Sequence, residues 1–310
     1  MTFTTAFLKT PKVLSLESKG DRSPVRPVMI WRQNRLIITV ADKVDSAGQF
    51  IPALQNQQWF EACLRNSPVS SVRLDMALGE EALKDWANAC KLTGKKVYVH
   101  LPTATYLPRL RAPNAWFIKR VADWIAAAAI ALVLSPLFLV LAAIVYLESP
   151  GPMFFRQWRV GHRGQLFQIM KFRTMRIDAE KFHHQVMGHQ AGLHKLENDP
   201  RVTRSGRWLR KYSLDELPQL LNVLRGEMSL VGPRPLALYD AMRISPATQK
   251  RLNALPGMTG FWQVAMRSNG RDLEMVSRVD IDYLQRWSLL EDLRIMLMTI
   301  PKVLRGFGAF

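Results

Sequence analysis

Two adjacent carboxylates, Asp215 and Glu216, stand within the most basic stretch of the chain. With Ser213 they form the pattern Ser-Leu-Asp-Glu, which is typical of a capping box in which Glu216 reaches back to a helix start. Pro218 is tolerated only near a helix start, so we expect both acids in a first helical turn. There the helix dipole favours their ionised forms. Capping alone explains two such acids, and in isolation it is the simpler interpretation.

The basic residues around the two acids indicate chemistry beyond capping. Arg207, Arg210 and Lys211 share one face of a predicted helix. Arg234 stands between two prolines in Gly-Pro-Arg-Pro, so its guanidinium is held in a stiff loop and suits bidentate binding of phosphate. Carboxylates among several arginines also suit Mg²⁺ bound with a diphosphate. Residues 201–236 therefore predict a site for phosphoryl transfer.

Lys171 and Arg173 form a second candidate for binding an anion. They lie in the second of two strand-like runs, Phe154–Val160 and Leu166–Met175, which the turn Gly161–Gly164 joins into a predicted hairpin. Side chains two residues apart project from one face of a strand, so we expect both to point the same way. A solvated strand face and a phosphate-binding face are the open alternatives, and we retain both residues as candidate phosphate ligands.

An uncharged apolar run, Trp124–Leu147, lies between two basic halves of the chain. As a straight helix it is long enough to cross the ~30 Å hydrocarbon core of a membrane. Residues 1–120 and residues 121–310 each carry a net charge of +9, and basic segments favour the cytoplasmic side. Ser135-Pro136 at the midpoint can bend the helix so that it returns to the side it entered. A kinked ordinary span is the alternative.

The composition limits the functions that the whole chain can have. Its 310 residues carry a net charge of +18, which suits nucleic acid, an anionic membrane surface or a phosphorylated substrate. The apolar run favours the membrane, and we expect no nucleic-acid partner. The N-terminal residues lack the apolar core of a secretory signal. Cys63 and Cys90 have neither metal-type spacing nor a disulfide framework, as expected in a reducing cytosol.

Five segments follow from these patterns, and together they predict an α+β protein. Residues 1–30 are polar and irregular, an expected mobile arm, and residues 31–101 predict a small α/β domain with a parallel sheet, regulatory or for docking. Residues 102–115 form a proline-rich linker, residues 116–150 the membrane helix, and residues 151–310 a helix-rich catalytic domain. The elements expected in the small domain are strands Leu36–Val40, Ser71–Asp75 and Val97–Leu101 and helices Phe50–Leu64 and Glu80–Thr93.

Three later features have weaker signals. Pro256–Gln263 reads PGMTGFWQ, a glycine-punctuated loop with exposed-looking aromatics, and Arg267 follows it. Leu289–Leu304 is an amphipathic helix whose apolar face fits either the protein core or a membrane interface. Four histidines in a polar segment fit no metal template and predict a solvated, mobile loop: His183, His184, His189 and His194.

Residues from about 115 to 305 resemble the bacterial sugar transferases, the monotopic polyprenyl-phosphate phosphoglycosyl transferases that begin exopolysaccharide or O-antigen synthesis. The resemblance rests on KRVADW, on Ser135-Pro136 and on four longer motifs: SPGPMFFRQWRVGHRGQLFQIMKFRTM, NDPRVTRSGRWLRKYSLDELPQLLNVLRGEMSLVGPRP, PGMTGFWQV and DYLQRWSLLEDLRIM. It does not cover residues 1–110, which are unlike the additional parts of the family's larger members.

The resemblance implies specific roles for the candidate residues. Asp215 would be the nucleophile that attacks the β-phosphate of a UDP-sugar, so that UMP leaves and a phosphoglycosyl-aspartate forms. Polyprenyl (undecaprenyl) phosphate would then accept the phosphosugar. Glu216 would organise the metal or transfer a proton, and both acids are candidate ligands of Mg²⁺. Arg210, Arg234 and Arg267 match positions for phosphate or nucleotide contacts.

The resemblance also implies a topology. The helix that contains Ser135-Pro136 would be re-entrant, so that both halves lie at the cytoplasmic face of the bacterial inner membrane, in contact with its lipids. A homo-oligomer is compatible with the sequence. The chain departs from the family at Ala265-Met266, next to Arg267, where relatives commonly have Ser-Gly.

Two other functions are open alternatives. A membrane-anchored protein that binds lipid or polymer on its basic surface explains the charge and the apolar run, but not two acids within the basic stretch. A hydrolase would use Asp215 to cleave diphosphates with water. Release of UMP only in the presence of polyprenyl phosphate separates a transferase from a hydrolase, and no release favours the binding protein.

Overall fold

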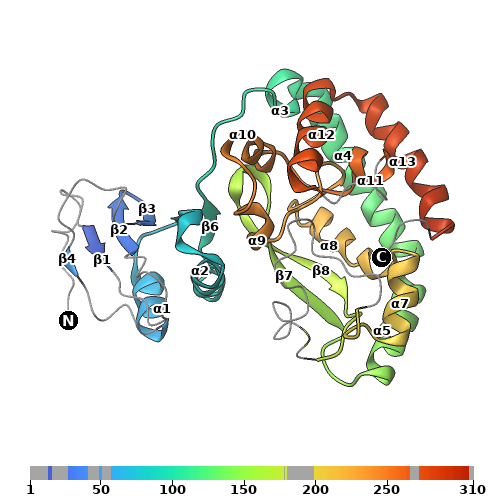
Figure 1. Ribbon diagram of the computed structural model, residues 1–310, viewed down its shortest axis with the longest axis horizontal. Helices are drawn as coiled ribbons and strands as arrows, with labels where there is room; N and C mark the ends of the chain where they lie inside the picture. Colours follow the sequence, from blue (N-terminus) through green and yellow to red (C-terminus); the bar gives the residue numbers. More distant parts are fainter. Residues whose placement is uncertain are drawn as a thin grey trace. The chain divides into compact units, whose positions relative to one another are not determined.

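The computed structural model of the chain describes residues 13–15, 27–40, 49–50, 57–177, 179, 199–265 and 272–306. The chain divides into two compact units (Figure 1). One unit is Met1–His100 with Gly164–Leu166, and the other is Leu101–Arg163 with Phe167–Phe310. Each unit has its own strands, helices and buried apolar side chains.

The N-terminal unit is built on a six-stranded sheet in the order β4-β1-β2-β3-β5-β6. The pairs β1–β2 and β2–β3 are antiparallel, whereas β3–β5, β5–β6 and β1–β4 are parallel. The strands are β1 (Val13–Ser15), β2 (Pro27–Arg32), β3 (Arg35–Val40), β4 (Gln49–Phe50), β5 (Ser71–Leu74) and β6 (Lys96–Val99). The helices are α1 (Gln57–Asn66), the 3₁₀ turn η4 (Met76–Leu78) and α2 (Glu80–Leu92).

The predicted parallel sheet is found in β3, β5 and β6, but it is only part of the sheet. Residues 1–30 are predicted to be irregular, whereas the structure places β1 and the start of β2 there. β2 pairs with β3 through a tight turn in which Gln33 has φ 50°. Non-glycine residues rarely take this conformation, so no turn motif marks the hairpin in the sequence. The predicted helix Phe50–Leu64 is also displaced, because β4 includes its first residue and α1 spans later residues.

Alternation along the strands explains the core of this unit. Leu36 and Ile38 of β3 lie two residues apart and are fully buried, and β5 repeats the pattern. Helices α1 and α2 meet through Phe60 and Trp86, whose ring centroids are 4.1 Å apart. The unit therefore has a core of its own.

The C-terminal unit begins with three helices: α3 (Pro108–Arg111), α4 (Pro113–Val133) and α5 (Ser135–Glu148). The axes of α4 and α5 are bent by 63° at a break where Leu134 stands between them. Pro136 lies in the first turn of α5, where a residue without an N–H is tolerated. Because it has no N–H, Pro136 cannot continue the backbone hydrogen bonds of α4. Ser135 Oγ donates a hydrogen bond to Leu132 O at 2.8 Å. Within the described ranges no single helix is long and apolar enough to cross a membrane, whereas this bent pair together meets that length and hydropathy.

A hairpin and a series of short helices follow the bent pair. The hairpin consists of β7 (Phe154–Val160), the 3₁₀ turn η5 (His162–Gly164) and β8 (Leu166–Phe172), as predicted. β9 (Ser229–Val231) and β10 (Gly257–Thr259) form a separate parallel pair. The remaining helices are α7 (Arg204–Lys211), η6 (Leu214–Glu216), α8 (Gln219–Leu224), α9 (Leu238–Ala241), α10 (Pro246–Gln249), η7 (Lys250–Asn253), α11 (Phe261–Ala265), α12 (Leu273–Arg286) and α13 (Leu289–Leu304).

Apolar side chains of the bent pair pack against the elements that follow it. One cluster joins Ala127 of α4 to Phe167 of β8 and to Leu220 and Val223 of α8. A second cluster joins Leu141 of α5 to Phe172 of β8 and Leu209 of α7. In Figure 1, α8 accordingly runs beside α4, and α7 lies against α5. The bent pair therefore positions the hairpin, α7 and α8. Lys171 lies in the hairpin and Arg210 in α7, and the two acids lie between α7 and α8.

A buried polar network attaches α4 to α12 and α13. Lys119 Nζ lies 2.6 Å from Asp292 Oδ2 and 3.6 Å from Asp123 Oδ2. Asp292 also accepts hydrogen bonds from Tyr283 Oη at 2.5 Å and from Trp287 Nε1 at 3.1 Å. Buried charges require such partners. The network therefore joins the start of α4 to the C-terminal helices.

Helix α13 has the predicted bounds and exposes much of its apolar face. Ser288 caps it, because the Ser288 hydroxyl accepts a hydrogen bond from Glu291 N at 3.1 Å. Ile295 is fully buried, whereas Leu290 is 76% exposed and Leu304 is 72% exposed. The prediction that the apolar face of this helix packs in the protein core is therefore correct for one side only.

Candidate active site

The two acids lie in a tight turn and not in the first turn of a longer helix. Asp215 and Glu216 belong to the 3₁₀ turn η6, whereas α8 begins only after Pro218. Ser213 takes the left-handed conformation, with φ 54°, and its side chain makes no capping hydrogen bond. The predicted capping box is therefore wrong, because a capping residue has extended backbone and the chain instead reverses sharply at Ser213. Capping does not explain why two acids stand here.

Two basic side chains from distant segments converge on Glu216. Lys171 Nζ of β8 lies 2.6 Å from Glu216 Oε1, and Arg234 Nη2 lies 3.9 Å from the same oxygen. All three side chains are largely buried. The structure thus brings Lys171 together with two candidates from residues 201–236, a proximity that the strand pattern left open.

Asp215 is more deeply buried than Glu216, with only 8% of its surface exposed. Burial raises the pKa of the Asp215 carboxyl to about 6, and the negative charge of Glu216 contributes to this rise. The positive charges of Lys171, Arg210 and Arg234 act in the opposite direction and lower the pKa. At neutral pH the carboxylate therefore predominates. A buried carboxylate with a raised pKa among several cations is typical of a functional site.

Arg210 approaches Asp215 from helix α7. Its Nε donates to Thr174 Oγ1 at 2.9 Å, just after β8. The helix comes this close because a Cβ on Gly206 would lie only 2.1 Å from the carbonyl oxygen of Thr174, so no larger residue fits. Arg207 and Lys211, which were expected to share the face of Arg210, are exposed to solvent. Of the three, Arg210 is the one that acts on the charge of Asp215.

Two further arginines hold the loop of Arg234 by its backbone. Arg251 Nη2 donates to the carbonyl oxygen of Arg234 at 3.0 Å and forms a fully buried ion pair with Asp280. Arg159 Nη1, from β7, donates to the carbonyl oxygen of Pro235 at 3.2 Å. Together with the flanking prolines, these contacts restrict where the Arg234 guanidinium can lie.

Sequence reasoning does not identify these supporting residues, although one signal was present. Asp280 lies on the same face of α12 as the buried Val276 and Tyr283. A carboxylate at such a position requires a buried partner. That partner is Arg251, 29 residues earlier in the chain, and only the fold brings the two together.

Glycines bring Pro256–Gln263 against the loop of Arg234. A Cβ on Gly257 would lie 2.1 Å from Gly232 N, and a Cβ on Gly260 would lie 2.3 Å from Gly232 O. The expectation of exposed aromatics is wrong for Trp262, which is 3% exposed. This motif therefore supports the Arg234 loop through close backbone contact at Gly232.

Arg173 contacts the end of α5 instead of the acids. Its Nη2 donates to the carbonyl oxygen of Ser149. Arg173 follows the last residue of β8, so the alternation that predicts a shared face with Lys171 no longer applies to it. Arg267 and the four histidines lie outside the part of the chain that the structure describes.

The acid pair offers two neighbouring carboxylates as ligands for a metal ion. Among the described residues no group of three or more His, Cys, Asp and Glu side chains could hold one. Mg²⁺ is commonly bound by one or two carboxylates together with substrate phosphates and water. The donor set of Asp215 and Glu216 fits a magnesium ion that binds with a diphosphate, and it does not fit an all-protein cage.

Comparison with known proteins assigns the region of this site to a family. The model of the bacterial sugar transferase family matches residues 114–306, which include the acids, Lys171, Arg210 and Arg234. The chain belongs to the bacterial sugar transferases. Residues 1–113 lie outside the match, which agrees with the motifs, since these do not cover residues 1–110.

Three relatives illustrate the range of this bacterial sugar transferase family. Exopolysaccharide production protein ExoY of Rhizobium meliloti is 41% identical over 207 residues, which are 64% of this chain and 90% of the relative. UDP-glucose:undecaprenyl-phosphate glucose-1-phosphate transferase of Caulobacter vibrioides is 47% identical over 200 residues, 62% of this chain and 72% of the relative. Galactosyl transferase CpsE of Streptococcus agalactiae is 43% identical over 165 residues, 52% of this chain but only 37% of the relative.

Proposed function

We propose that this chain transfers a sugar phosphate from a UDP-sugar to polyprenyl phosphate, which yields a polyprenyl-diphosphate-sugar and UMP. The observation that carries the proposal is Asp215, a buried carboxylate surrounded by Lys171, Arg210 and Arg234. Such a group is suited to attack a diphosphate whose charge the cations offset. The Caulobacter relative is named for UDP-glucose and undecaprenyl phosphate, which supports this donor and acceptor. The reaction would begin the synthesis of an exopolysaccharide or O-antigen.

Two displacements at one phosphorus account for the reaction. A carboxylate oxygen of Asp215 attacks the β-phosphorus of the UDP-sugar, the bond from that phosphorus to the bridging oxygen breaks, and UMP leaves with the electron pair. An oxygen of polyprenyl phosphate then attacks the same phosphorus of the phosphoglycosyl-aspartate. The acyl-phosphate bond breaks and the carboxylate is restored. With a pKa of about 6 the Asp215 carboxyl is mostly ionised at neutral pH, so its attack needs no separate base.

The neighbours of Asp215 bind and orient the diphosphate. Glu216 holds the ammonium of Lys171 and attracts the guanidinium of Arg234, so both cations stay beside the reacting carboxylate. The stiff loop presents the Arg234 guanidinium for bidentate contact with phosphate oxygens. Asp215 and Glu216 would hold Mg²⁺ together with diphosphate oxygens, and a bound Mg²⁺ would offset the charge of the diphosphate.

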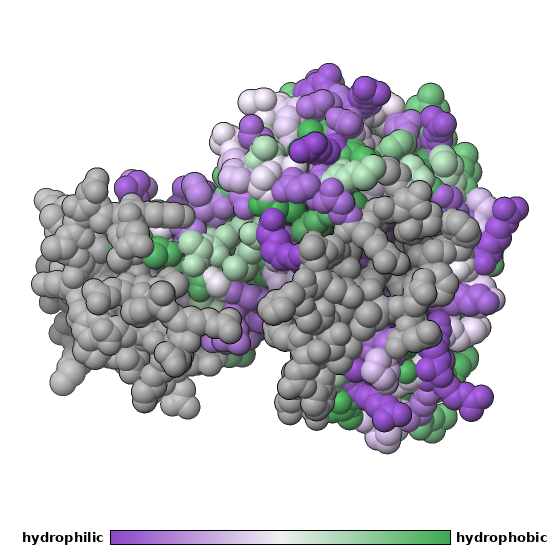
Figure 2. All heavy atoms as spheres, in the orientation of Figure 1, coloured by the Kyte–Doolittle hydropathy of each residue, from purple (hydrophilic) through white to green (hydrophobic). Residues whose placement is uncertain are grey.

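The proposal includes a location at the cytoplasmic face of the bacterial inner membrane, with α4 and α5 as a re-entrant helix. The 63° bend at the break supports this topology. Figure 2 shows hydrophobic residues at the surface beside α13 and at the lower edge near α5. Large exposed apolar surfaces of this kind mark contact with a membrane or a partner. The most exposed apolar side chains of these helices are Leu132 (76%), Val133 (76%), Leu139 (74%), Leu147 (79%) and Leu290 (76%).

A loading experiment without acceptor lipid tests the proposal. The purified full chain, with Mg²⁺ and a UDP-sugar that it turns over, should release about one UMP per active site and then stop. Intact-mass measurement should show one added phosphosugar, which polyprenyl phosphate then discharges. Asp215→Asn should abolish both signals. Asp282→Asn, which changes an exposed aspartate of α12, is the matched control and should leave them intact.

Other outcomes would point to the alternative functions. Continuous UMP release without lipid would identify a hydrolase that uses water as acceptor. No release with any sugar of a UDP-sugar panel would favour a basic lipid- or polymer-binding protein. Turnover that depends on lipid but shows no burst and no adduct would exclude the covalent aspartate and indicate direct transfer.

A further inference from the structure

A cavity at the start of α4 gathers basic side chains from three elements. Its volume is about 410 Å³, and Arg109 of α3, Arg120 of α4 and His162 of η5 line it. Trp116 and Phe117 of α4 supply aromatic walls. None of the residues that line this cavity belongs to the cluster around the acid pair. It is therefore a second site of concentrated positive charge.

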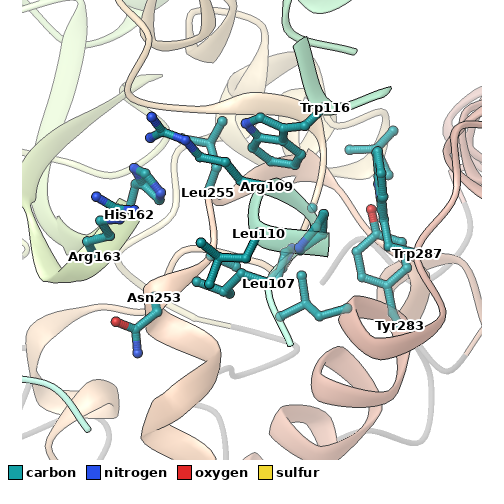
Figure 3. A pocket seen from close by; sticks show the side chains of 16 residues that line it. Leu107, Arg109, Leu110, Trp116, His162, Arg163, Asn253, Leu255, Tyr283 and Trp287 are labelled. Atoms are coloured by element: carbon teal, nitrogen blue, oxygen red, sulfur yellow. The ribbon is translucent and has the colours of Figure 1, made fainter. Parts of the chain in front are cut away.

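Two guanidinium groups in this region have no partner among the residues that the structure describes. Arg163, next to His162, lines a second, adjoining pocket, which shares Arg109, Trp116 and His162 with the cavity. Figure 3 shows Arg109, His162 and Arg163 gathered on one side of this adjoining pocket. Arg120 is paired with Asp123 at 3.3 Å. The side chains of Arg109 and Arg163 make no hydrogen bond or ion pair with any residue in the described ranges. Their donors are available to an anion.

The state of His162 shows how little negative charge this region contains. Burial lowers the pKa of the imidazole to about 4, and repulsion by Arg163, Arg109 and Arg120 contributes to the shift. No Asp or Glu lines the cavity or the adjoining pocket. The backbone of Arg163 is also in the left-handed region, with φ 55°, which non-glycine residues rarely adopt. Such conformations cluster at ligand-binding sites.

The cavity opens next to an exposed apolar surface of α4. Phe117 lines the cavity and is 69% exposed. Val121, Trp124 and Ile125 follow it by four, seven and eight residues, so they lie on the same side of the helix, and each is more than 40% exposed. The basic cavity and the apolar face thus meet at Phe117. A ligand that fits both has an anionic group joined to hydrocarbon.

We propose that this cavity binds the phosphate of a membrane phospholipid headgroup, with the acyl chains along the exposed face of α4. The inference rests on the membrane location proposed above. Arg109 from the cavity and Arg163 from the adjoining pocket donate to phosphate oxygens through charge-assisted hydrogen bonds, and Trp116, which lines both, covers the region between headgroup and chains. The acceptor lipid must reach Asp215, which does not line the cavity, so the occupant is a second lipid molecule.

Calorimetric titration of the purified full chain in a nonionic detergent, without UDP-sugar, tests the cavity independently of transfer. The probes are dihexanoyl phosphatidylglycerol below its micelle concentration, undecaprenyl phosphate and inorganic phosphate. The test variant is Arg109→Gln/Arg163→Asn, because asparagine tolerates the left-handed backbone. The control, Arg65→Gln/Arg278→Asn, removes the same charge from two exposed arginines elsewhere.

We expect saturable binding of the phosphatidylglycerol to the unmodified chain and the control, and binding weaker by roughly tenfold or more in the test variant. Equal lipid binding by the test variant would overturn the site. Inorganic phosphate that binds as tightly as the lipid would overturn a lipid occupant, and tighter binding of undecaprenyl phosphate at this site would assign the cavity to the acceptor. If circular dichroism shows that the double variant is unfolded, the single variants Arg109→Gln and Arg163→Gly are judged by the same criteria.

Discussion

Replacing Lys119 with methionine tests how the start of α4 is attached to the C-terminal helices. Lys119 is 4% exposed, and its Nζ lies 2.6 Å from Asp292 Oδ2. Methionine has a similar length and volume, so Lys119→Met removes the charge without opening a large cavity. The buried Asp292 carboxylate then loses its cation and keeps only the donors Tyr283 Oη and Trp287 Nε1.

The structure sets the size of the expected effect. Removing one partner of a buried ion pair costs about 3–5 kcal/mol. Asp123, the second neighbour of Lys119, keeps Arg120 at 3.3 Å and Ser229 Oγ at 2.6 Å, so the loss falls mainly on Asp292. We therefore expect Lys119→Met to lower the free energy of unfolding by about 3 kcal/mol.

A control on α13 separates burial from mere charge. Arg294 Nη1 lies 3.9 Å from Glu291 Oε2 and the Arg294 side chain is 69% exposed, so Arg294→Met should cost less than about 1 kcal/mol. The double variant Lys119→Met/Asp292→Asn should regain about half of the loss, because it removes the unpaired buried charge, although its single amide oxygen can replace only one of the two acceptors that serve Tyr283 Oη and Trp287 Nε1. Urea unfolding of the full chain in detergent, followed by near-ultraviolet circular dichroism, measures all three. Equal losses for Lys119→Met and Arg294→Met, or a double variant less stable than the single one, would refute the reasoning.

Four further predictions concern the site and the bent helix pair. Asp215→Asn should abolish UMP release, whereas Glu216→Gln should keep a trace of it. Near-normal release by a folded Asp215→Asn variant would show that Asp215 is not the nucleophile. Arg234→Lys should lower kcat/KM by the equivalent of about 2–4 kcal/mol, since lysine cannot make the bidentate contact, and an unchanged kcat/KM would mean that only charge matters. Asp280→Asn and Arg234→Lys should each lower kcat/KM, and the double variant should lose less than the two single losses combined, because both residues act through one loop. Fully additive losses would show that the two residues act independently. Pro136→Leu should straighten the helix, so that in sealed cells one end of the protein becomes accessible to an impermeant reagent that labels a cysteine placed near that end. Unchanged labelling would show that the proline does not decide the topology.

Local signals in the sequence determined several elements of this protein. The break between α4 and α5 falls at Leu134, directly before Ser135-Pro136, because a proline cannot continue the hydrogen-bond ladder of the preceding helix wherever that helix is packed. The bounds Leu289–Leu304 of α13 follow from a capping serine and a 3.6-residue apolar period. The hairpin of β7 and β8 and the concentration of charge around the acids were likewise readable from neighbouring residues.

Only the tertiary structure decided which charges meet. Lys171 and Arg173 look equivalent in the sequence, yet one reaches Glu216 and the other reaches Ser149, because β8 ends between them. Ser213 has the sequence of a cap, but the reversal after α7 places it in the left-handed conformation and the acids in a separate turn. The supports of the Arg234 loop come from β7, η7 and α12, and the two arginines that contact the loop are 17 and 76 residues away from their partners along the chain. Local patterns depend on nearest neighbours, whereas the partner of a buried charge is set by how distant elements pack, so this part of the site was not readable from the sequence.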